Sequence, residues 1–405
     1  MRIIVQKYGG SSVATVKRIQ RVAKRIVELK DQNTAVVVVV SAMGKTTDKL
    51  VAKAHSITEQ PKVREYDMLL ATGEQVSIAL VTMAIDALGC EAVSLTGAQA
   101  GIITDNVHGK ATISEIHTER IMKLLNEGKI VIVAGFQGVN LEDDITTLGR
   151  GGSDTTAVAL AAALKAELCE ILTDVDGVYS ADPNKIDSAR KLDEISYDEM
   201  LELASLGAKV LHPRSVELAK EYGVDLHVRS SFNMREGTIV KEEETLEKKR
   251  IVSGIASDPK IAKVSVLGVP DRPGIAATIF GALAEAHINV DIIVQNVNRE
   301  GINDISFTIS RDDADHAVAT LKKLPQDMCA GGVVVDDKIA KVSIVGAGMI
   351  SRPGVAAGMF RALADEGINI DMISTSEIRV SCIIARNRAD DAVSALHRAF
   401  ESDLA

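Results

Sequence analysis

Leu148-Gly149-Arg150-Gly151-Gly152-Ser153-Asp154-Thr155-Thr156 is the stretch from which the fold and function of this chain can be argued. It follows an apolar run at 130–136 and leads directly into an apolar, helix-like segment. Three glycines within four positions let the backbone adopt positive φ and approach a ligand closely. A glycine turn that opens a helix presents free N–H groups and the positive dipole end to an anion. Arg150 adds a planar guanidinium suited to a carboxylate or phosphate, and Ser153 or Asp154 is expected to cap the helix.

The bulk composition indicates an acidic globular chain of two or three domains. Its 405 residues exceed what one hydrophobic core usually holds. The net charge of −10, without a basic run interleaved with aromatics, argues against nucleic acid as a main partner. The four cysteines form no Cys-x-x-Cys pair, which argues against a zinc site and for a reducing compartment. Neither a membrane-length apolar run nor a signal peptide is evident, so we expect a cytoplasmic protein without a membrane partner.

The chain opens with the pattern of a phosphate-binding turn. Residues 2–6 are typical of a β-strand, Lys7-Tyr8-Gly9-Gly10-Ser11-Ser12 is a glycine turn, and 13–29 have the apolar spacing of a helix. Strand, glycine turn and helix together form the geometry that holds phosphates, with Lys7 at the end of the strand. Taken alone the pattern is weak, because many α/β units begin this way and Lys7 could be a solvated lysine.

A second ligand-binding loop is expected after the valine run at 35–40. Such an apolar, β-branched run is typical of a central parallel strand buried on both faces. The following Gly44-Lys45-Thr46 resembles the end of a P-loop, but Val39 stands where that motif needs glycine, so we reject a P-loop. The loop still lies at the carboxyl end of a strand, where open α/β sheets bind ligands.

The rest of the N-terminal region alternates between helices and strands. We expect helices at 67–88, 115–125, 197–206 and 210–221, and strands at 91–95, 101–104, 129–136, 169–174 and 224–229. Glu74 could be a first-turn acid of its helix, and His108 and His117 are interpreted as surface residues. The acidic turn from Asp174 to Pro183 could hold a metal or a ribose, although Asp176 also fits an ordinary Asp-Gly turn.

A charged run at 241–250 predicts a domain boundary, and an internal repeat follows it. Arg272-Pro273-Gly274 returns as Arg352-Pro353-Gly354, and Ile288-Asn289-Val290-Asp291 returns as Ile368-Asn369-Ile370-Asp371. Each copy has the pattern of a βαββαβ module. We expect domains at 1–245, 246–335 and 336–405, allowing for strands exchanged between the two modules.

Together these motifs resemble aspartate kinase, in the monofunctional type with two C-terminal ACT domains. The resemblance covers nearly the whole chain and rests on Lys7 to Val13, Ser41 to Gly44, Gly73-Glu74, Thr147 to Thr156 and Thr173 to Tyr179, together with the repeat. It implies an α/β amino-acid-kinase fold, a mostly parallel sheet flanked by helices, followed by two α+β ferredoxin-like ACT modules. It also implies that ATP, with Mg²⁺, phosphorylates L-aspartate to 4-phospho-L-aspartate, the first step towards lysine, threonine and methionine.

The resemblance also implies roles for individual residues. The catalytic residues would be Lys7, Asp154 and Lys209, with Asp154 orienting the lysines or holding magnesium. Aspartate would be bound by Ser41, Thr47, Glu74, Arg150, Gly151, Gly152 and Ser153. ATP would be bound by Lys7, Tyr8, Gly9, Gly10, Thr173, Asp174, Tyr179, Ser180, Asp182, Pro183, Lys185 and Lys209. No residue is assigned as a ligand of a resident metal.

The two ACT modules imply feedback inhibition by lysine, threonine or both. The first module of one subunit would pack on the second module of its partner, in a dimer or with a shorter C-terminal subunit. Candidate effector residues in the first copy are Asp271, Ala276, Asn289, Val290, Asp291 and Gln295. Those in the second copy are Val355, Ala356, Asn369, Ile370, Asp371, Thr375, Ser376 and Glu377. Asn289 and Asn369 could instead stabilise turns.

Two alternatives compete with this interpretation. One is a kinase of the same fold that acts on a different carboxylate or a carbamate, against which the ACT pair and the Glu74 region argue. The other is a non-catalytic amino-acid sensor, against which the intact Lys7, Arg150, Asp154 and Lys209 argue.

Overall fold

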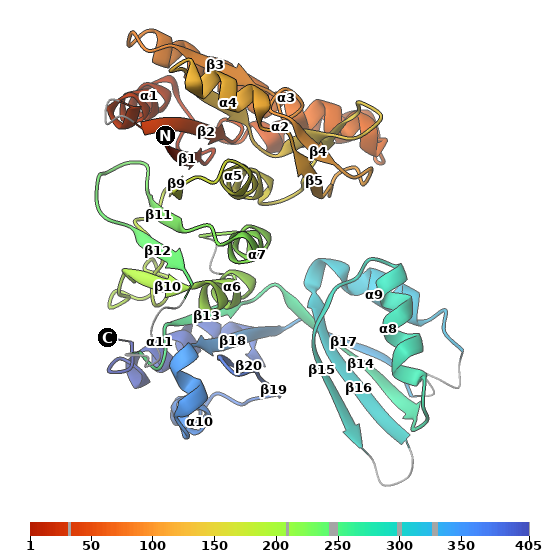
Figure 1. Ribbon diagram of the computed structural model, residues 1–405. Helices are drawn as coiled ribbons and strands as arrows, with labels where there is room; N and C mark the ends of the chain where they lie inside the picture. Colours follow the sequence, from red (N-terminus) through yellow and green to blue (C-terminus); the bar gives the residue numbers. More distant parts are fainter. Residues whose placement is uncertain (31–33, 208–209, 243–249, 298–301, 326–330, 405) are drawn as a thin grey trace. The chain divides into compact units, whose positions relative to one another are not determined.

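A computed structural model describes residues 1–30, 34–207, 210–242, 250–297, 302–325 and 331–404 (Figure 1). The chain divides into two compact units. The first unit contains Met1–Tyr179, Lys191–Ser205 and Lys209–Leu246, and the second contains Ser180–Arg190, Leu206–Ala208 and Glu247–Ala405. The predicted boundary run at 241–250 lies largely outside the described residues.

The first unit is built on an eight-stranded sheet in the order β10-β12-β11-β9-β1-β2-β6-β3. Its strands are β1 Arg2–Tyr8, β2 Thr34–Val40, β3 Ala92–Leu95, β6 Ile130–Ala134, β9 Leu168–Thr173, β10 Glu194–Ser196, β11 Leu226–Ser230 and β12 Thr238–Lys241. Every neighbouring pair is parallel except β11 and β12. Every residue of β2 is buried, which confirms the central strand predicted from the valine run.

Helices accompany this sheet: α1 Val16–Lys30, α2 Thr46–Ile57, α3 Val63–Asp86, α4 Glu119–Asn126, α5 Gly152–Ala163, α6 Tyr197–Ser205 and α7 Pro213–Tyr222. Side chains of α1 and α3, such as Ile26 and Ile85, pack with Val38 and Ile132 into one apolar core. By length and composition α3 could cross a membrane, and no other helix in the described ranges could. Its inward face, however, is buried in that core.

A smaller sheet in the first unit has the order β5-β4-β7-β8, with β4 Ile102–Thr104, β5 Ile113–Ile116, β7 Gln137–Val139 and β8 Ile145–Thr147. The helix predicted at 115–125 was wrong at its start, because Ile116 pairs with Ile102 in this sheet and α4 begins only at Glu119. The helix predicted from 210 begins at Pro213, since proline suits the first turn of a helix and keeps the preceding His212 extended.

The first repeat forms a sheet in the order β15-β16-β14-β17. Its elements are β14 Ile261–Pro270, α8 Ile275–Glu285, β15 Val290–Val297, β16 Ile302–Ser310, the 3₁₀ helix η1 Arg311–Asp313, α9 Ala314–Leu321 and β17 Gly332–Asp336. Figure 1 shows α8 and α9 on one face of this sheet, where Ile279, Leu283 and Phe307 are buried between helices and strands. This is the βαββαβ arrangement predicted from the sequence.

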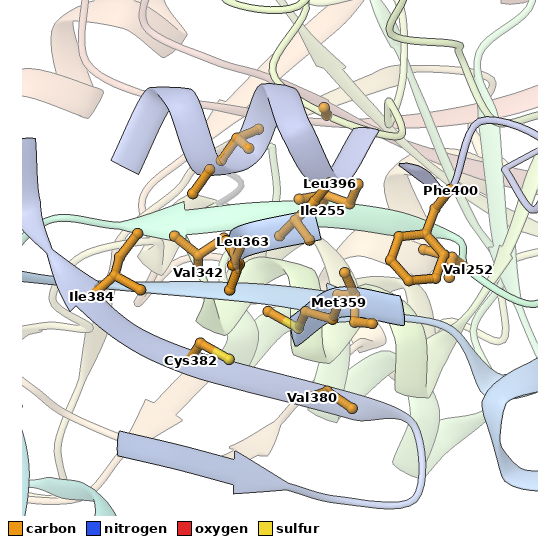
Figure 2. Packing of buried hydrophobic residues seen from close by; sticks show 14 of the residues in the cluster. Val252, Ile255, Val342, Met359, Leu363, Val380, Cys382, Ile384, Leu396 and Phe400 are labelled. Carbon is orange, nitrogen blue, oxygen red and sulfur yellow. The ribbon is translucent and has the colours of Figure 1, made fainter. Parts of the chain in front are cut away.

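The second repeat recruits a strand from before the first one. Its sheet has the order β13-β18-β20-β19, with β13 Gly254–Asp258, β18 Ile339–Val345, η3 Ala347–Ser351, α10 Val355–Asp365, β19 Met372–Thr375, β20 Arg379–Ala385, η4 Arg386–Arg388 and α11 Ala389–Ala399. β13 pairs antiparallel with β18 and occupies the place that β17 has in the first module. Figure 2 shows Val342 and Ile384 of the sheet close to Met359 and Leu363 of α10 and Leu396 of α11.

The two modules contact each other through reciprocal ion pairs. Lys263 of β14 pairs with Asp371, and Lys341 of β18 pairs with Asp291. Each pair therefore joins the first strand of one module to the repeated Asn-x-Asp of the other. An apolar cluster that includes Ile261, Ile292, Ile339, Met372 and Ile383 lies between the modules.

Candidate active site

The predicted ligand-binding loops leave the large sheet at one edge. Tyr8, the last residue of β1, is in register with Val40 of β2 and Leu172 of β9, and Val40 is in register with Ala134 of β6. Because these strands are parallel and end together, the loops that follow them share the carboxyl edge of the sheet. Open α/β sheets bind ligands at this edge.

Lys7 and Asp154 form an ion pair at this edge. The Lys7 Nζ and Asp154 Oδ1 atoms are 2.5 Å apart, and the two side chains are only 12% and 13% exposed. Lys7 comes from β1 and Asp154 from the first turn of α5. Asp154 Oδ1 is buried, and among the described residues no donor meets the geometry of a hydrogen bond to it. The carboxylate therefore holds the ammonium group of Lys7 beside the start of α5.

The start of α5 is shaped by glycine. Gly151 is the N-cap residue, with φ +71°, and no side chain caps the helix. The prediction that Ser153 or Asp154 would be the cap was wrong, because the carboxylate of Asp154 is engaged by Lys7 instead. A Cβ atom at Gly151 would lie 2.2 Å from Cγ of His212, so this position excludes any side chain.

The glycine turn after β1 packs against the loop after β2, backbone to backbone. Gly44 N donates to Gly10 O at 3.0 Å. A Cβ atom at Gly10 would lie 2.6 Å from Ala42 O, which leaves no room for a side chain. Open space remains around Gly9, whose nearest neighbour would be Lys7 Nζ at 3.7 Å. The backbone of Gly9 and the ammonium group of Lys7 are therefore neighbours.

Glu74 is a buried acid with one unused oxygen. It lies in the middle of α3 and not in a first turn, which corrects the interpretation as a first-turn acid, and it is 3% exposed. Oε1 accepts a hydrogen bond from Ala42 N at 2.9 Å, whereas Oε2 is buried and accepts none from the described part of the chain. Burial raises the pKa of Glu74 to about 7. A buried acceptor left without a partner is costly, so this oxygen is suited to a cationic ligand group.

The remaining predicted aspartate-binding residues border the same loops. Ser153 is buried beside Gly135, where a Cβ atom would lie 2.7 Å from Ser153 Oγ. Ser41 and Thr47 are partly exposed. The guanidinium of Arg150 is exposed, and it forms no hydrogen bond or ion pair with residues that the structure describes. Lys209, the third predicted catalytic residue, lies outside the described residues.

The predicted ATP-binding residues divide between the two units. Thr173 and Asp174 follow β9 in the first unit, where Thr173 Oγ1 donates to Asp174 Oδ1 at 3.1 Å. Ser180, Asp182, Pro183 and Lys185 belong to the second unit. Their role in binding ATP stays a prediction.

The predicted effector residues of the first module do not gather at one place within the chain. Asp271 follows Pro270 of β14, which pairs with Ile302 at the start of β16. Asp291 follows Val290 of β15, which pairs with Ile309 near the end of β16. Seven residues of β16 separate these positions, which is roughly 23 Å along a strand. In the second module, Asn369 and 375–377 are exposed along and beside the edge strand β19. Asp291 and Asp371 are already engaged in the ion pairs between modules.

Sequence reasoning missed Asp67, a fully buried carboxylate of α3. It accepts hydrogen bonds from Thr147 Oγ1 at 2.6 Å and Thr147 N at 3.1 Å, and from Gly109 N at 2.9 Å. His108 Nδ1 lies 2.9 Å from it, so the interpretation of His108 as a surface residue was wrong. Asp67 thereby fixes the backbone just before the stretch that carries Arg150. The sequence did contain a signal for Asp67, because it lies seven residues before Glu74 and therefore on the same face of the helix.

His212 was also missed, although it lies against Gly151. Burial lowers its pKa, and Nδ1 is buried without a hydrogen bond to any described residue. The ring is therefore held neutral at pH 7 beside the glycine turn. No sequence pattern links His212 to Gly151, because α5 and α7 meet only in the folded chain.

Comparison with known proteins extends these observations to the whole chain. The amino acid kinase family matches residues 2–230, and the ACT domain matches 264–326 and 342–400. The chain is 56% identical to an aspartokinase of Bacillus sp. (strain MGA3) and 54% identical to aspartokinase 2 of Bacillus subtilis (strain 168). Each match spans 401 residues, which is 99% of this chain and 98% of the relative.

Solved structures agree with these relatives. Aspartokinase III of E. coli, in complex with aspartate and ADP, is 27% identical with a TM-score of 0.85, over 99% of this chain and 100% of that one. Aspartate kinase from Synechocystis is 48% identical with a TM-score of 0.56, over 98% of this chain and 69% of that one. The predicted fold class is thus confirmed. The chain belongs to the aspartokinase family and is an ATP-dependent phosphotransferase, with an amino acid kinase domain followed by two ACT domains.

Proposed function

We propose that the chain transfers the γ-phosphoryl group of ATP to the side-chain carboxylate of L-aspartate, giving 4-phospho-L-aspartate and ADP. The observation that carries the proposal is the buried Lys7–Asp154 pair beside the glycine turns at the carboxyl edge of the sheet. The complex of E. coli aspartokinase III with aspartate and ADP supports the choice of substrates. In biosynthesis, this reaction would be the first step towards lysine, threonine and methionine.

The chemistry requires charge neutralisation and no general base. The attacking carboxylate has a pKa near 4, so it is ionised at neutral pH. The obstacle is repulsion between this anion and the nucleotide phosphates, and catalysis then comes from positioning and electrostatics. Lys7 would neutralise the transferring phosphoryl group while Gly9 and Gly10 donate backbone N–H groups to it. Lys209 would lie along the phosphates on the leaving-group side.

Aspartate would be held by opposite charges at its two ends. Arg150 would bind the α-carboxylate, and its exposed guanidinium without a partner among the described residues supports this role. Glu74 and Thr47 would bind the α-ammonium group, and the unused Oε2 of Glu74 supports that role. The loops that carry these groups also contain Ser41, Gly151 to Ser153 and Asp154.

Magnesium would enter together with the nucleotide. The described part of the chain contains no group of three or more His, Cys, Asp or Glu side chains that could hold a metal ion. Mg²⁺ commonly binds through one or two carboxylates plus substrate phosphates and waters. Asp154, in the first turn of α5, and Asp174, directly after β9, supply carboxylates that fit this requirement. The bound ion would neutralise phosphate charge.

Lysine, threonine or both would inhibit the enzyme by binding to the ACT modules. Aspartokinase III of E. coli has been solved in its T-state in complex with lysine and aspartate, which supports lysine as an effector. The exposed edge strands β15 and β19 are suited to contact a partner subunit. We infer a cytoplasmic homo-oligomer, either a dimer or an assembly with a shorter C-terminal subunit.

The test is a hydroxamate assay for acyl phosphate, with aspartate and ATP, in the presence and absence of lysine and threonine. A panel of other carboxylates and of carbamate, with coupled detection of ADP, is the control for substrate. The expected result is hydroxamate formation with aspartate that falls when effector is added. Turnover of a different acceptor in preference to aspartate would reject the proposed substrate. Undiminished activity with both amino acids would reject the regulation.

A further inference from the structure

The segment Ser180–Arg190 lies within the kinase part of the sequence but folds into the second unit. Ala181 and Ile186 are 4% and 7% exposed, and they belong to the apolar core that contains Leu396 and Phe400 (Figure 2). The predicted nucleotide residues Thr173 to Tyr179 come immediately before this segment. Part of the expected ATP-binding loop is therefore built into the core of the second ACT module.

The two ends of the segment are bonded to each other. Ser180 N donates to Arg190 O at 2.9 Å, and Arg190 N donates to Ser180 Oγ at 3.0 Å. The pairing continues into the first unit, where Leu192 N donates to Val178 O at 2.8 Å. The segment is thus the tip of a paired two-stranded connection. Its tip is therefore continuous, through this backbone pairing, with the residues that follow Thr173.

His397 of α11 attaches this segment to the second module. The ring is 1% exposed, with Nε2 3.1 Å from Ser180 Oγ and Nδ1 3.3 Å from Ser188 Oγ. A neutral imidazole provides one donor and one acceptor, which two hydroxyl groups can match. The arrangement is satisfied when Ser180 O–H donates to Nε2 and Nδ1–H donates to Ser188. Burial lowers the pKa of His397, which favours this neutral form.

Among the described residues, the segment has three further polar contacts with the second unit: a backbone bond from Ile255 N to Ser180 O at 2.8 Å, and ion pairs of Arg190 with Glu401 and of Lys185 with Asp390. The two ion pairs are weak. Lys185 Nζ lies 2.6 Å from Asp390 Oδ1 on α11, but both side chains are exposed. Exposed ion pairs contribute little because solvent screens them and the long side chains lose entropy. Among the polar side-chain contacts of the segment, His397 is therefore the one whose loss should matter most.

We propose that His397 is a positioning residue for nucleotide binding. By holding Ser180 and Ser188, it keeps the segment, and with it the Thr173 to Tyr179 turn, in the conformation that accepts ATP. A state of the second module that moves α11 would change the affinity for ATP. The affinity for aspartate would stay the same, because neither Glu74 nor Arg150 belongs to the paired connection that ends in Ser180–Arg190. This inference rests on the proposed function, in which Thr173 to Tyr179 line the nucleotide.

The experiment compares His397→Leu, which removes both hydrogen bonds at similar volume, with His397→Gln, which keeps a donor and an acceptor. His316→Leu is the matched control, because His316 is an exposed histidine on α9, the corresponding helix of the first module. Binding of MgADP to the full chain is measured directly, together with the KM for ATP and for aspartate. If the untethered segment is competent about one-tenth of the time, His397→Leu binds MgADP roughly tenfold more weakly.

The expected pattern is a raised KM for ATP with an unchanged KM for aspartate in His397→Leu. Partial recovery is expected in His397→Gln, and wild-type values in His316→Leu. Unchanged MgADP binding in His397→Leu would overturn the inference and leave the proposed function standing. If the wild-type protein bound no MgADP, both this inference and the proposed function would be rejected. If His397→Leu does not fold, Ser188→Ala decides: a KM for ATP raised alone supports the proposal, and two unchanged KM values overturn it.

Discussion

Glu74→Gln should make the free protein more stable at pH 8 than the wild type. The pKa of Glu74 is raised from 4.5 to about 7, because burial disfavours its ionised form. The folded state therefore keeps this proton to higher pH than the unfolded state, so the free energy of unfolding falls as pH rises from 4.5 to 7. At 1.36 kcal/mol per pKa unit, the loss is on the order of 3 kcal/mol. Glutamine cannot ionise, and its side-chain oxygen can still accept the hydrogen bond from Ala42 N.

The assay is urea unfolding of both proteins without ligand at pH 5 and pH 8. The variant and the wild type should be similar at pH 5, and the variant should gain on the order of 3 kcal/mol at pH 8. Glu170→Gln is the control of opposite sign. Burial alone would raise the pKa of Glu170, but hydrogen bonds with His227 and Gln6 and the charge of Arg229 outweigh it and lower this pKa to about 2. Its ionised form stabilises the fold above pH 4.5, so that variant should lose stability equally at pH 5 and pH 8.

Glu74→Gln should also weaken the binding of aspartate. If the ionised Glu74 binds the α-ammonium group, the wild-type KM for aspartate should rise roughly tenfold for each pH unit below 7. Glu74→Gln should have a high KM for aspartate at every pH and a normal KM for ATP. A stability difference that does not change with pH, together with an unchanged KM for aspartate, would refute the reasoning.

Three further substitutions test the rest of the site. Lys7→Ala should lower kcat by at least two orders of magnitude while the circular dichroism spectrum stays native. A positive charge that contacts the transferring phosphoryl group stabilises the transition state by several kcal/mol. Wild-type turnover in this variant would contradict the role of Lys7. Arg150→Lys should raise the KM for aspartate sharply and leave that for ATP unchanged, because lysine cannot form a bidentate clamp; an equal KM would locate the clamp elsewhere. Gly151→Ala should lower both Tm and kcat because its Cβ would meet His212, whereas Gly128→Ala, also at positive φ but in open space, should cost only the backbone strain. Equal effects of the two glycine substitutions would show that the contact with His212 is unimportant.

Much of the architecture could be predicted because it depends on local sequence patterns. The valine run at 35–40 could be assigned to a central strand from its composition alone, and the repeat indicated two modules before any pairing was known. Lys7 and Asp154 were both predicted as catalytic residues, and the structure brings them into contact. These features depend on short stretches whose neighbours in space follow from the parallel sheet.

Features that depend on distant contacts could not be predicted. The strand at 113–116 exists because it pairs with β4, and nothing in its own spacing marks it. Gly151 replaces a side-chain cap because Asp154 is drawn to a lysine far away in sequence. Asp67 and His212 are site-supporting residues only by virtue of loops that reach them in the fold.

Because β13 precedes the first module yet completes the sheet of the second, the C-terminal repeat is not a separable piece of chain. A fragment that begins after Asp258 would expose the backbone edge of β18 and should aggregate or stay unfolded. Any independently translated regulatory polypeptide must start upstream of Gly254, and Met234 is the nearest methionine that allows it. During synthesis on the ribosome, β13 would stay unpaired until the first module and then β18 have been translated.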